Sequence, residues 1–260
     1  ELMATGGISR RLLNIADAFL GRKYGGLALV TVVACMFFAA ISGSGPATVA
    51  AIGGLTIPSM LKQGYDRPFA GAISAAAGSI GVIIPPSTVM VSYSSVSEAS
   101  VGAMFMGGVI PGLLIGVSLC LYSSLYSKKH KYINAEAAPF SWGNVGRSLA
   151  DGIWALLVPV IILGGIYGGV FTPTEAAVVA TVYSIIVGIF VYHELTWQSF
   201  LDSLRATADM CGLTALALGF SMSFANFLAM QQIPQPPDSR TYSAEVTGFH
   251  RNLPHHRRLR

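Results

Sequence analysis

The sequence predicts an all-α membrane protein, a polytopic helical bundle that contains a re-entrant helical hairpin and a proline-broken helix. Charged residues make up only 11% of the chain and hydrophobic residues 53%, whereas about a quarter of the residues of a soluble domain are charged. Long uncharged stretches match the roughly 20 residues that cross a bilayer as a helix. Two of these stretches are interrupted by glycine and proline, which disfavour helix continuation.

The first elements are an arm, a hairpin and a broken helix. Residues 1–23 mix apolar and charged side chains in the manner of an amphipathic helix along the membrane interface. Residues 24–61 are uncharged but too long for one helix, and Ser42-Gly43-Ser44-Gly45-Pro46 interrupts them. We expect a hairpin that enters and leaves on one side. Two full spans would also return the chain there, but the small polar tip favours a re-entrant hairpin.

The remaining elements follow from the same pattern of uncharged runs. Residues 68–127 are expected to hold the broken helix and a transmembrane helix, and 152–193 a transmembrane pair around Thr172-Pro173-Thr174-Glu175. Glu175 is interpreted as a solvated loop charge or, alternatively, as a cap of the following helix. The other segments are a cytoplasmic loop (128–151), an interfacial connector (194–209), a transmembrane helix (210–233) and an atypical polar tail (234–260).

Clusters of lysine and arginine orient these segments. Such clusters mark the cytoplasmic side of a membrane. A single membrane topology places all three clusters on that side: Arg10, Arg11, Arg22 and Lys23; Lys62 and Arg67; Lys128, Lys129 and Lys131. The excess of basic residues comes mostly from the tail, so the charge does not indicate nucleic-acid binding. The three cysteines, Cys35, Cys120 and Cys211, match neither a metal spacing nor a disulfide framework.

The chemistry is expected at the two interruptions. A proline removes the hydrogen bond to the carbonyl four residues back, so Pro85 frees Gly81, Pro86 frees Val82, and Pro46 frees Ser42. The residue before a proline is pushed out of helical geometry, so Ile84 is predicted to lie in an extended turn. Free carbonyls persist in a membrane only where protein or a water-filled cavity satisfies them. The two breaks are therefore predicted to share one polar site.

This predicted site is uncharged and rich in oxygen. Carbonyls and hydroxyls suit a hard cation, and the half-helix N-termini after the breaks suit an anionic substrate, as in ion-coupled secondary transporters. The simpler alternative, that each proline only kinks its helix, is disfavoured by the double proline facing a Ser-Gly-Ser-Gly-Pro tip. A membrane enzyme is disfavoured because the sequence has no HExxH pair and no paired aspartates in apolar runs. A channel would also use broken helices and stays open as an alternative.

Three motifs in order resemble one family: FFAAISGSGPATVAAIG at 37–53, GVIIPPS at 81–87 and FTPTEAA at 171–177. Together they resemble the large membrane subunit, of DctM type, of tripartite ATP-independent periplasmic (TRAP) transporters. The resemblance covers residues 1 to about 235. It implies part of an elevator-type, inverted-repeat fold in the inner membrane of a bacterium. It further implies sodium-driven import of an organic acid, such as a C4-dicarboxylate or sialic acid, with a periplasmic substrate-binding protein and a small membrane subunit as partners.

The resemblance also implies site residues. No cofactor is expected beyond Na⁺ as the coupling ion, and the implied ligands of Na⁺ are the carbonyls of Ser42, Gly81, Ile84 and Pro86. Candidates for the substrate cavity adjoin the breaks: Ser44, Thr48, Ser87 and Thr88. These hydroxyls could instead bond back to helix carbonyls. The tip and the helix break themselves are formed by Gly43, Gly45, Pro46 and Pro85.

The tail departs from the family pattern. After residue 233 the family continues into a second arm, hairpin and broken helix, whereas this chain becomes polar and rich in arginine. We expect a reading-frame shift or a cloning artefact here, with the chain truncated at both ends relative to the family. A second sodium site and half of the substrate cavity would then be missing from it. A non-functional fragment of the transporter is therefore a further alternative.

Overall fold

The structure, a computed structural model, describes residues 2, 7–20, 23–97, 99–132 and 141–231. The described residues form helices joined by turns and contain no β-sheet, which confirms the predicted all-α fold. The chain divides into two units, residues 1–205 and 206–260. Four helices in the described ranges are long and apolar enough to cross a membrane: Val101–His130, Trp142–Tyr167, Pro173–Val191 and Trp197–Met230. The chain is thus a multi-pass membrane protein.

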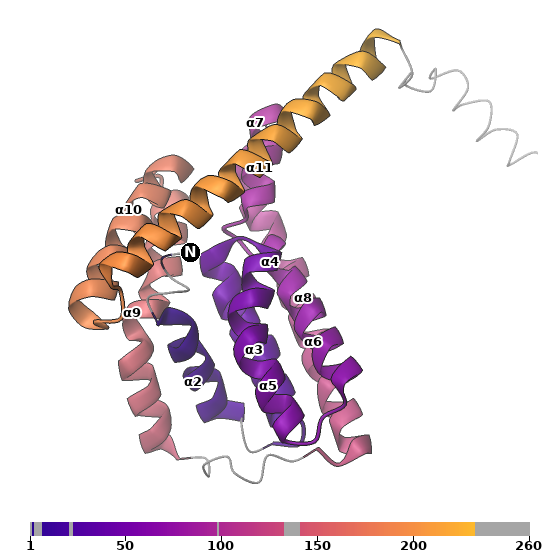
Figure 1. The fold of residues 1–260 in the computed structure, drawn as a ribbon, viewed down its shortest axis with the longest axis vertical. Coiled ribbons are helices and arrows are strands. Elements are labelled where there is room, and N and C mark those ends of the chain that lie inside the picture. Colours follow the sequence, from indigo (N-terminus) through magenta and orange to yellow (C-terminus); the bar gives the residue numbers. More distant parts are fainter. Residues whose placement is uncertain (1, 3–6, 21–22, 98, 133–140, 232–260) are drawn as a thin grey trace, which may run out of the picture. The chain divides into compact units, whose positions relative to one another are not determined.

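The centre of the first unit is helix α3, Gly26–Ser42, in which most side chains are buried. It packs against α6 (Arg67–Ser79) and α8 (Val101–His130) on one side and α2 (Ile8–Leu20) on the other (Figure 1). Helix α2 is amphipathic and buries Ile8, Leu12, Ile15 and Ala16 against the unit. Its apolar face therefore packs on protein, and its predicted location at a membrane interface stays a prediction.

The segment predicted as a hairpin consists of α3, a short turn, α4 (Gly45–Thr48), a π-helical turn η1 (Val49–Gly53) and α5 (Gly54–Lys62). Helices α3 and α5 contact each other. The break between them falls at Gly43 and Ser44, within the predicted tip. How far this hairpin enters the membrane stays a prediction.

The segment predicted as a broken helix is interrupted where the two prolines lie. Helix α6 ends at Ser79 and passes through a 3-10 turn, η2 (Ile80–Val82), into an irregular segment, after which α7 runs Thr88–Ser97. The Pro85–Pro86 peptide is cis. Helix α8 follows and is long enough to cross the membrane without a break.

The later helices correct three predicted boundaries. Helix α8 continues to His130 and α9 (Trp142–Tyr167) begins well before residue 152, so the predicted loop 128–151 is mostly helical in its described part. Lys128 and Lys129 lie in the last turn of α8, where cations are favourable, so they do not end the helix. The predicted connector 194–209 and span 210–233 form one helix, α11 (Trp197–Met230), because no proline separates them. The tail lies outside the described residues.

Helices α9 and α10 (Pro173–Ile186, continued by the π-helical turn η3, Val187–Val191) form the predicted pair. The turn between them is closed by a capping box, in which the Thr172 hydroxyl accepts from the Glu175 amide and the Glu175 carboxylate accepts from the Thr172 amide at 2.8 Å. Of the two interpretations of Glu175, the helix cap is thus confirmed.

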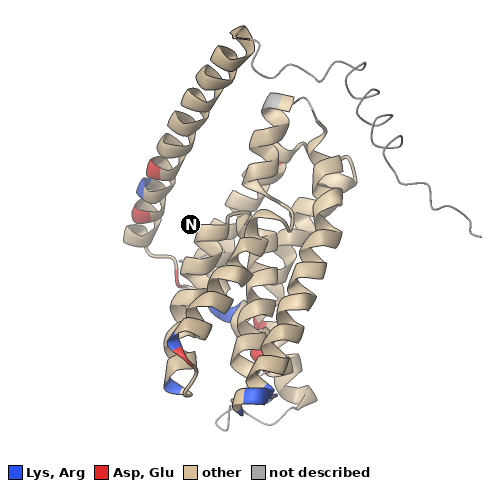
Figure 2. Ribbon diagram, turned by 90° about the vertical axis from the view of Figure 1, so that its right-hand side faces the viewer, with Lys and Arg blue, Asp and Glu red and all other residues tan. Residues whose placement is uncertain are grey.

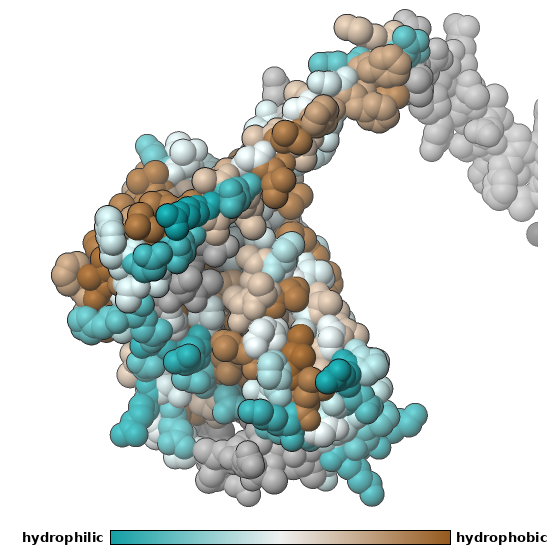
Figure 3. Space-filling model, viewed as in Figure 1, coloured by the Kyte–Doolittle hydropathy of each residue, from teal (hydrophilic) through white to brown (hydrophobic). Residues whose placement is uncertain are grey.

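Basic residues gather at one end of the first unit. Most of its described lysines and arginines, drawn in blue, lie in the lower half of Figure 2. Hydrophilic residues are likewise concentrated at the lower end of this unit in Figure 3. That this end faces the cytoplasm stays a prediction from the positive-inside rule.

Candidate functional site

The two breaks meet. Thr88, the first residue of α7, donates two hydrogen bonds to the carbonyl oxygen of Gly43 at the hairpin tip, one from its amide at 3.1 Å and one from its hydroxyl at 2.9 Å. Gly43 has no further turn of α3 to satisfy its carbonyl, because the helix ends at Ser42. The first residue of the helix after the double proline therefore satisfies the carbonyl that follows the helix ending at the tip.

The tip depends on glycine at position 43. Gly43 adopts φ 63°, ψ 12°, in the left-handed region, and its amide bonds back to the Ala39 carbonyl at 3.1 Å. Glycine ends helices in this conformation without steric cost. A methyl group on Gly43 would also lie 2.6 Å from the carbonyl oxygen of Pro86. The backbone at Gly43 and the backbone at Pro86 are thus so close that no side chain fits at position 43.

A cluster of oxygens fills the space behind the tip. The Thr48 hydroxyl donates to the Ser44 carbonyl at 2.7 Å and lies 2.9 Å from the Ser42 hydroxyl. A methyl group on Gly81 would lie 2.6 Å from the Thr48 hydroxyl and 2.8 Å from the Ser44 carbonyl oxygen. Gly81 of the broken helix is therefore in direct contact with the polar groups of the hairpin.

The freed carbonyl of Val82 is satisfied locally. Pro86 cannot donate to it, and the Ser87 hydroxyl does so instead at 2.8 Å. The same hydroxyl accepts from the Met90 amide at 3.4 Å and so helps to start α7. The Ile84 amide still bonds to the Ile80 carbonyl at 2.9 Å. This bond reaches beyond η2, which ends at Val82, into the irregular segment before α7, and the extended geometry expected of Ile84 stays a prediction.

All four substrate-cavity candidates form hydrogen bonds within the protein. Thr48 and Ser87 are buried and bond to carbonyls, Ser44 accepts from the Ala47 amide at 3.5 Å as the N-cap of α4, and Thr88 holds Gly43. These bonds match the alternative in which the hydroxyls stabilise the break. Ser44 is half-buried and Thr88 exposed, so these two are the accessible members of the set. Contact with substrate stays a prediction for all four.

Helix α8 supports the break through glycines that the sequence interpretation did not use. Three buried glycines one turn apart face the broken helix and the hairpin: side-chain atoms at Gly108, Gly112 and Gly116 would overlap the Ile83 carbonyl, the Ile84 side chain and the Met36 side chain. Small residues at four-residue spacing let membrane helices approach closely. This spacing in the sequence was the signal that could have found them.

The candidate site is uncharged. Its described ligand atoms are backbone carbonyls and hydroxyls, and the described residues contain no group of three or more His, Cys, Asp or Glu that could hold a metal ion. Such a donor set lacks the imidazole, thiolate and carboxylate groups that transition metals and zinc prefer. It suits a weakly held, hard cation.

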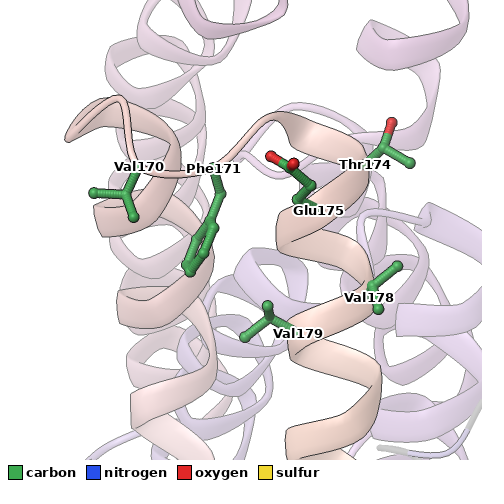
Figure 4. Close-up of a pocket in the computed structure, with 6 residues that line it drawn as sticks. All are labelled: Val170, Phe171, Thr174, Glu175, Val178 and Val179. Carbon is green, nitrogen blue, oxygen red and sulfur yellow. The ribbon is translucent and has the colours of Figure 1, made fainter.

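A separate pocket of about 430 Å³ lies between the end of α9 and the start of α10. Its walls are mainly apolar; Figure 4 shows Phe171 beside the end of α9 and Glu175 at the start of α10. The Glu175 carboxylate already accepts from the Thr172 amide and hydroxyl at 2.8 and 2.9 Å. Its acidic group thus serves the helix cap.

A half-buried arginine connects the arm to the rest of the unit. Arg11 on α2 pairs with Glu194 at 2.8 Å and Asp151 at 3.5 Å, and its guanidinium lies 3.6 Å from the ring centre of Tyr192. The Tyr192 hydroxyl donates to the Asp151 carbonyl at 3.1 Å. The sequence indicates Arg11 as a polar residue of the amphipathic arm and as part of a basic cluster, but not its partners, because they lie far away in the sequence.

Known proteins that are similar to this chain are permeases of TRAP transporters. The family model described as the DctM component of tripartite ATP-independent periplasmic transporters matches residues 1–236. The isethionate TRAP transporter permease protein DctMQ of Oleidesulfovibrio alaskensis is 50% identical over 232 residues, which are 89% of this chain and 36% of the relative.

Two further relatives match a similar share of this chain. The C4-dicarboxylate TRAP transporter large permease protein DctM of Pseudomonas aeruginosa is 44% identical, over 90% of this chain and 54% of its own length. The sialic acid TRAP transporter large permease protein SiaM of Vibrio cholerae is 39% identical, over 90% of this chain and 55% of its own length. The chain thus spans between about a third and just over half of the relatives that it matches.

Proposed function

Because the chain belongs to the family of DctM components of TRAP transporters, we propose that it is part of the large membrane subunit of a sodium-coupled importer of organic acids. The observation that carries this proposal is the double hydrogen bond from Thr88 to the Gly43 carbonyl, which joins the two helix breaks. Joined breaks lined by oxygens are how ion-coupled transporters hold a cation and a substrate together.

The proposed cation site consists of the carbonyls of Ser42, Gly81, Ile84 and Pro86. Two contacts support it: the Pro86 carbonyl lies against Gly43, and Gly81 lies against the Ser44 carbonyl and the Thr48 hydroxyl. Pro46 and Pro85 cannot donate to the carbonyls of Ser42 and Gly81, which keeps their oxygens available. Sodium held between the breaks would strengthen their contact. Movement of sodium down its gradient would then drive uptake of the acid.

The proposed substrate is a small organic anion. The relatives are named for isethionate, a sulfonate, and for C4-dicarboxylates and sialic acid, which are carboxylates. The N-terminus of α7, which starts at Thr88, offers a positive dipole end next to the cation site. Which acid is transported would depend on the rest of the subunit and on the binding protein.

The proposed partners follow from the family. They are a periplasmic substrate-binding protein, which delivers the acid, and a small membrane subunit. The relative named DctMQ is a permease protein of which this chain covers 36%, so the region matched here is one part of a longer protein. We propose the bacterial inner membrane as the location and an elevator-like movement of the part that contains the breaks.

The test is replacement of Pro85 and Pro86 by alanine in the complete transporter, reconstituted in liposomes with its partners. Restoring the amides lets the helix re-form hydrogen bonds to Gly81 and Val82. We expect uptake to lose its sodium dependence or to need several-fold more sodium. The matched control is Pro159→Ala, another proline inside a membrane helix but away from the breaks. Unchanged sodium-dependent uptake by the Pro85→Ala/Pro86→Ala variant would overturn the proposal.

A channel remains the second candidate, since it too would use broken helices. The liposome assay separates the two. A transporter saturates with substrate and requires the binding protein, whereas flux through a channel rises in proportion to concentration without it.

A further inference from the structure

Three chain segments that carry basic residues meet at Tyr132. Its carbonyl accepts from the Gly25 amide at 2.9 Å, its hydroxyl donates to Asp66 at 2.8 Å, and its ring stacks on Tyr65 at 4.4 Å. Gly25 is the N-cap of α3, Tyr65 and Asp66 lie in the turn between α5 and α6, and Tyr132 follows the C-terminus of α8. One residue therefore holds the ends of four helices together.

This meeting point, which we term the basic junction, concentrates positive charge. It comprises six exposed cations on the three segments: Lys23, Lys62, Arg67, Lys128, Lys129 and Lys131. The ion pairs recorded in the described part of the chain involve only Arg11 and Arg205. Asp66, the acidic residue in the junction, is engaged by Tyr132. Burial raises the pKa of Tyr65 to about 12, so this ring adds no charge.

An exposed apolar stripe on α8 leads directly to the junction. Five large side chains at spacings of three or four residues are each more than 60% exposed: Ile110, Leu114, Val117, Leu121 and Leu125. Residues at this spacing share one face of a helix. Lys128 follows Leu125 by three residues and therefore continues the same face. A membrane-spanning helix thus presents an apolar track that ends in a cation.

We propose that the basic junction and this stripe form a binding site for an anionic phospholipid. The phosphate of the headgroup pairs with Lys128 and its neighbours in the junction, and an acyl chain lies along the stripe from Leu125 toward Ile110. The junction lies at the end of the protein that the positive-inside rule assigns to the cytoplasm, where the leaflet is negatively charged. The site is independent of the proposed transport reaction, because its residues are not those of the helix breaks.

The test measures lipid selectivity of the complete transporter in phosphatidylcholine bilayers. Trace spin-labelled phosphatidylglycerol or phosphatidylcholine is added, and the fraction immobilised on the protein gives the relative association of the two lipids. We expect a preference for phosphatidylglycerol, and a loss of roughly fivefold or more in the Lys128→Gln/Lys129→Gln variant, since each basic residue near the surface contributes appreciably. The matched control is Arg10→Gln/Arg147→Gln, which removes the same charge from exposed positions on α2 and α9.

The outcomes are distinct. A preference that is lost with the lysines and kept in the control supports the site. No preference in the unaltered protein, or equal loss in both variants, overturns it, because bulk charge would then explain the result. Adding inorganic phosphate, with chloride at equal ionic strength as reference, distinguishes the source of the phosphate. If phosphate alone abolishes the preference, the junction binds a soluble anion and the lipid proposal is wrong.

Discussion

Gly43 shows how a single residue controls the candidate site. Its left-handed backbone turns the chain at the end of α3, and its missing side chain admits the Pro86 carbonyl. Its own carbonyl then receives both bonds from Thr88. These three features lie on one residue, so a change there affects both the turn and the contact between the breaks.

We therefore predict that Gly43→Ala lowers stability and transport together. The left-handed conformation costs an alanine about 1 kcal/mol, and the overlap with Pro86 must be relieved by moving the breaks apart. The measurements are thermal denaturation in detergent and sodium-dependent uptake in liposomes. The control is Gly54→Ala in the same hairpin, where no atom lies within 4 Å of the added methyl group and φ is helical. Equal behaviour of the two variants would contradict this account of the tip.

At the scale of elements, Arg11 connects helix α2 to the segments around Asp151 and Glu194. Its side chain is 14% exposed, and those of Glu194 and Asp151 are 35% and 56% exposed. The pair with Glu194 is thus partly shielded, while the longer pair with Asp151 is screened by solvent. Stacking on Tyr192 adds a cation–π contact. The arm is held to the region after α10 by polar contacts in addition to its apolar face.

We predict that Arg11→Gln lowers the stability of the protein and that the same substitution at the neighbouring Arg10 leaves it unchanged. The expected coupling between Arg11 and Glu194 is about 1 kcal/mol, after allowance for the exposure of Glu194. A double-mutant cycle with Glu194→Gln, followed by thermal denaturation, measures this coupling. Arg10→Gln is the matched control because Arg10 is exposed on the same helix. Additive effects of Arg11→Gln and Glu194→Gln would show that the ion pair contributes nothing.

At the scale of the whole molecule, the distribution of charge predicts how the chain lies in the membrane. The lysines at the end of α8 and the turn at Thr172–Glu175 are separated by helix α9, which is long enough to span the bilayer. They are therefore expected on opposite sides, with the lysines in the cytoplasm.

Labelling of single cysteines checks this orientation. Cys35, Cys120 and Cys211 are first replaced by serine, and cysteine is then introduced as Lys129→Cys or Thr174→Cys. We expect a membrane-impermeant maleimide to label the Thr174→Cys protein in intact cells and the Lys129→Cys protein only after permeabilisation. The reverse pattern would invert the proposed topology, and labelling of both in intact cells would mean that α9 does not cross.

The sequence by itself determined that the chain is a helical membrane protein and where both helix breaks lie. It also determined which end is expected to face the cytoplasm. Each depends on residues close together in the chain: apolar runs long enough to span, prolines that lack an amide, and clusters of lysine. It also indicated that the breaks share a site, and the structure brings them together through Thr88 and Gly43.

Only the tertiary structure decided which atoms meet. Gly81 approaches Thr48, the glycines of α8 admit Ile83 and Ile84, Arg11 finds Glu194, and Tyr132 joins three segments. It also showed that α8 and α9 extend into the predicted loop and that α11 is continuous. The physical reason is that hydropathy and proline act locally, whereas contact between distant residues depends on how the helices pack. Helix ends likewise depend on capping and packing more than on the charge of the residues there.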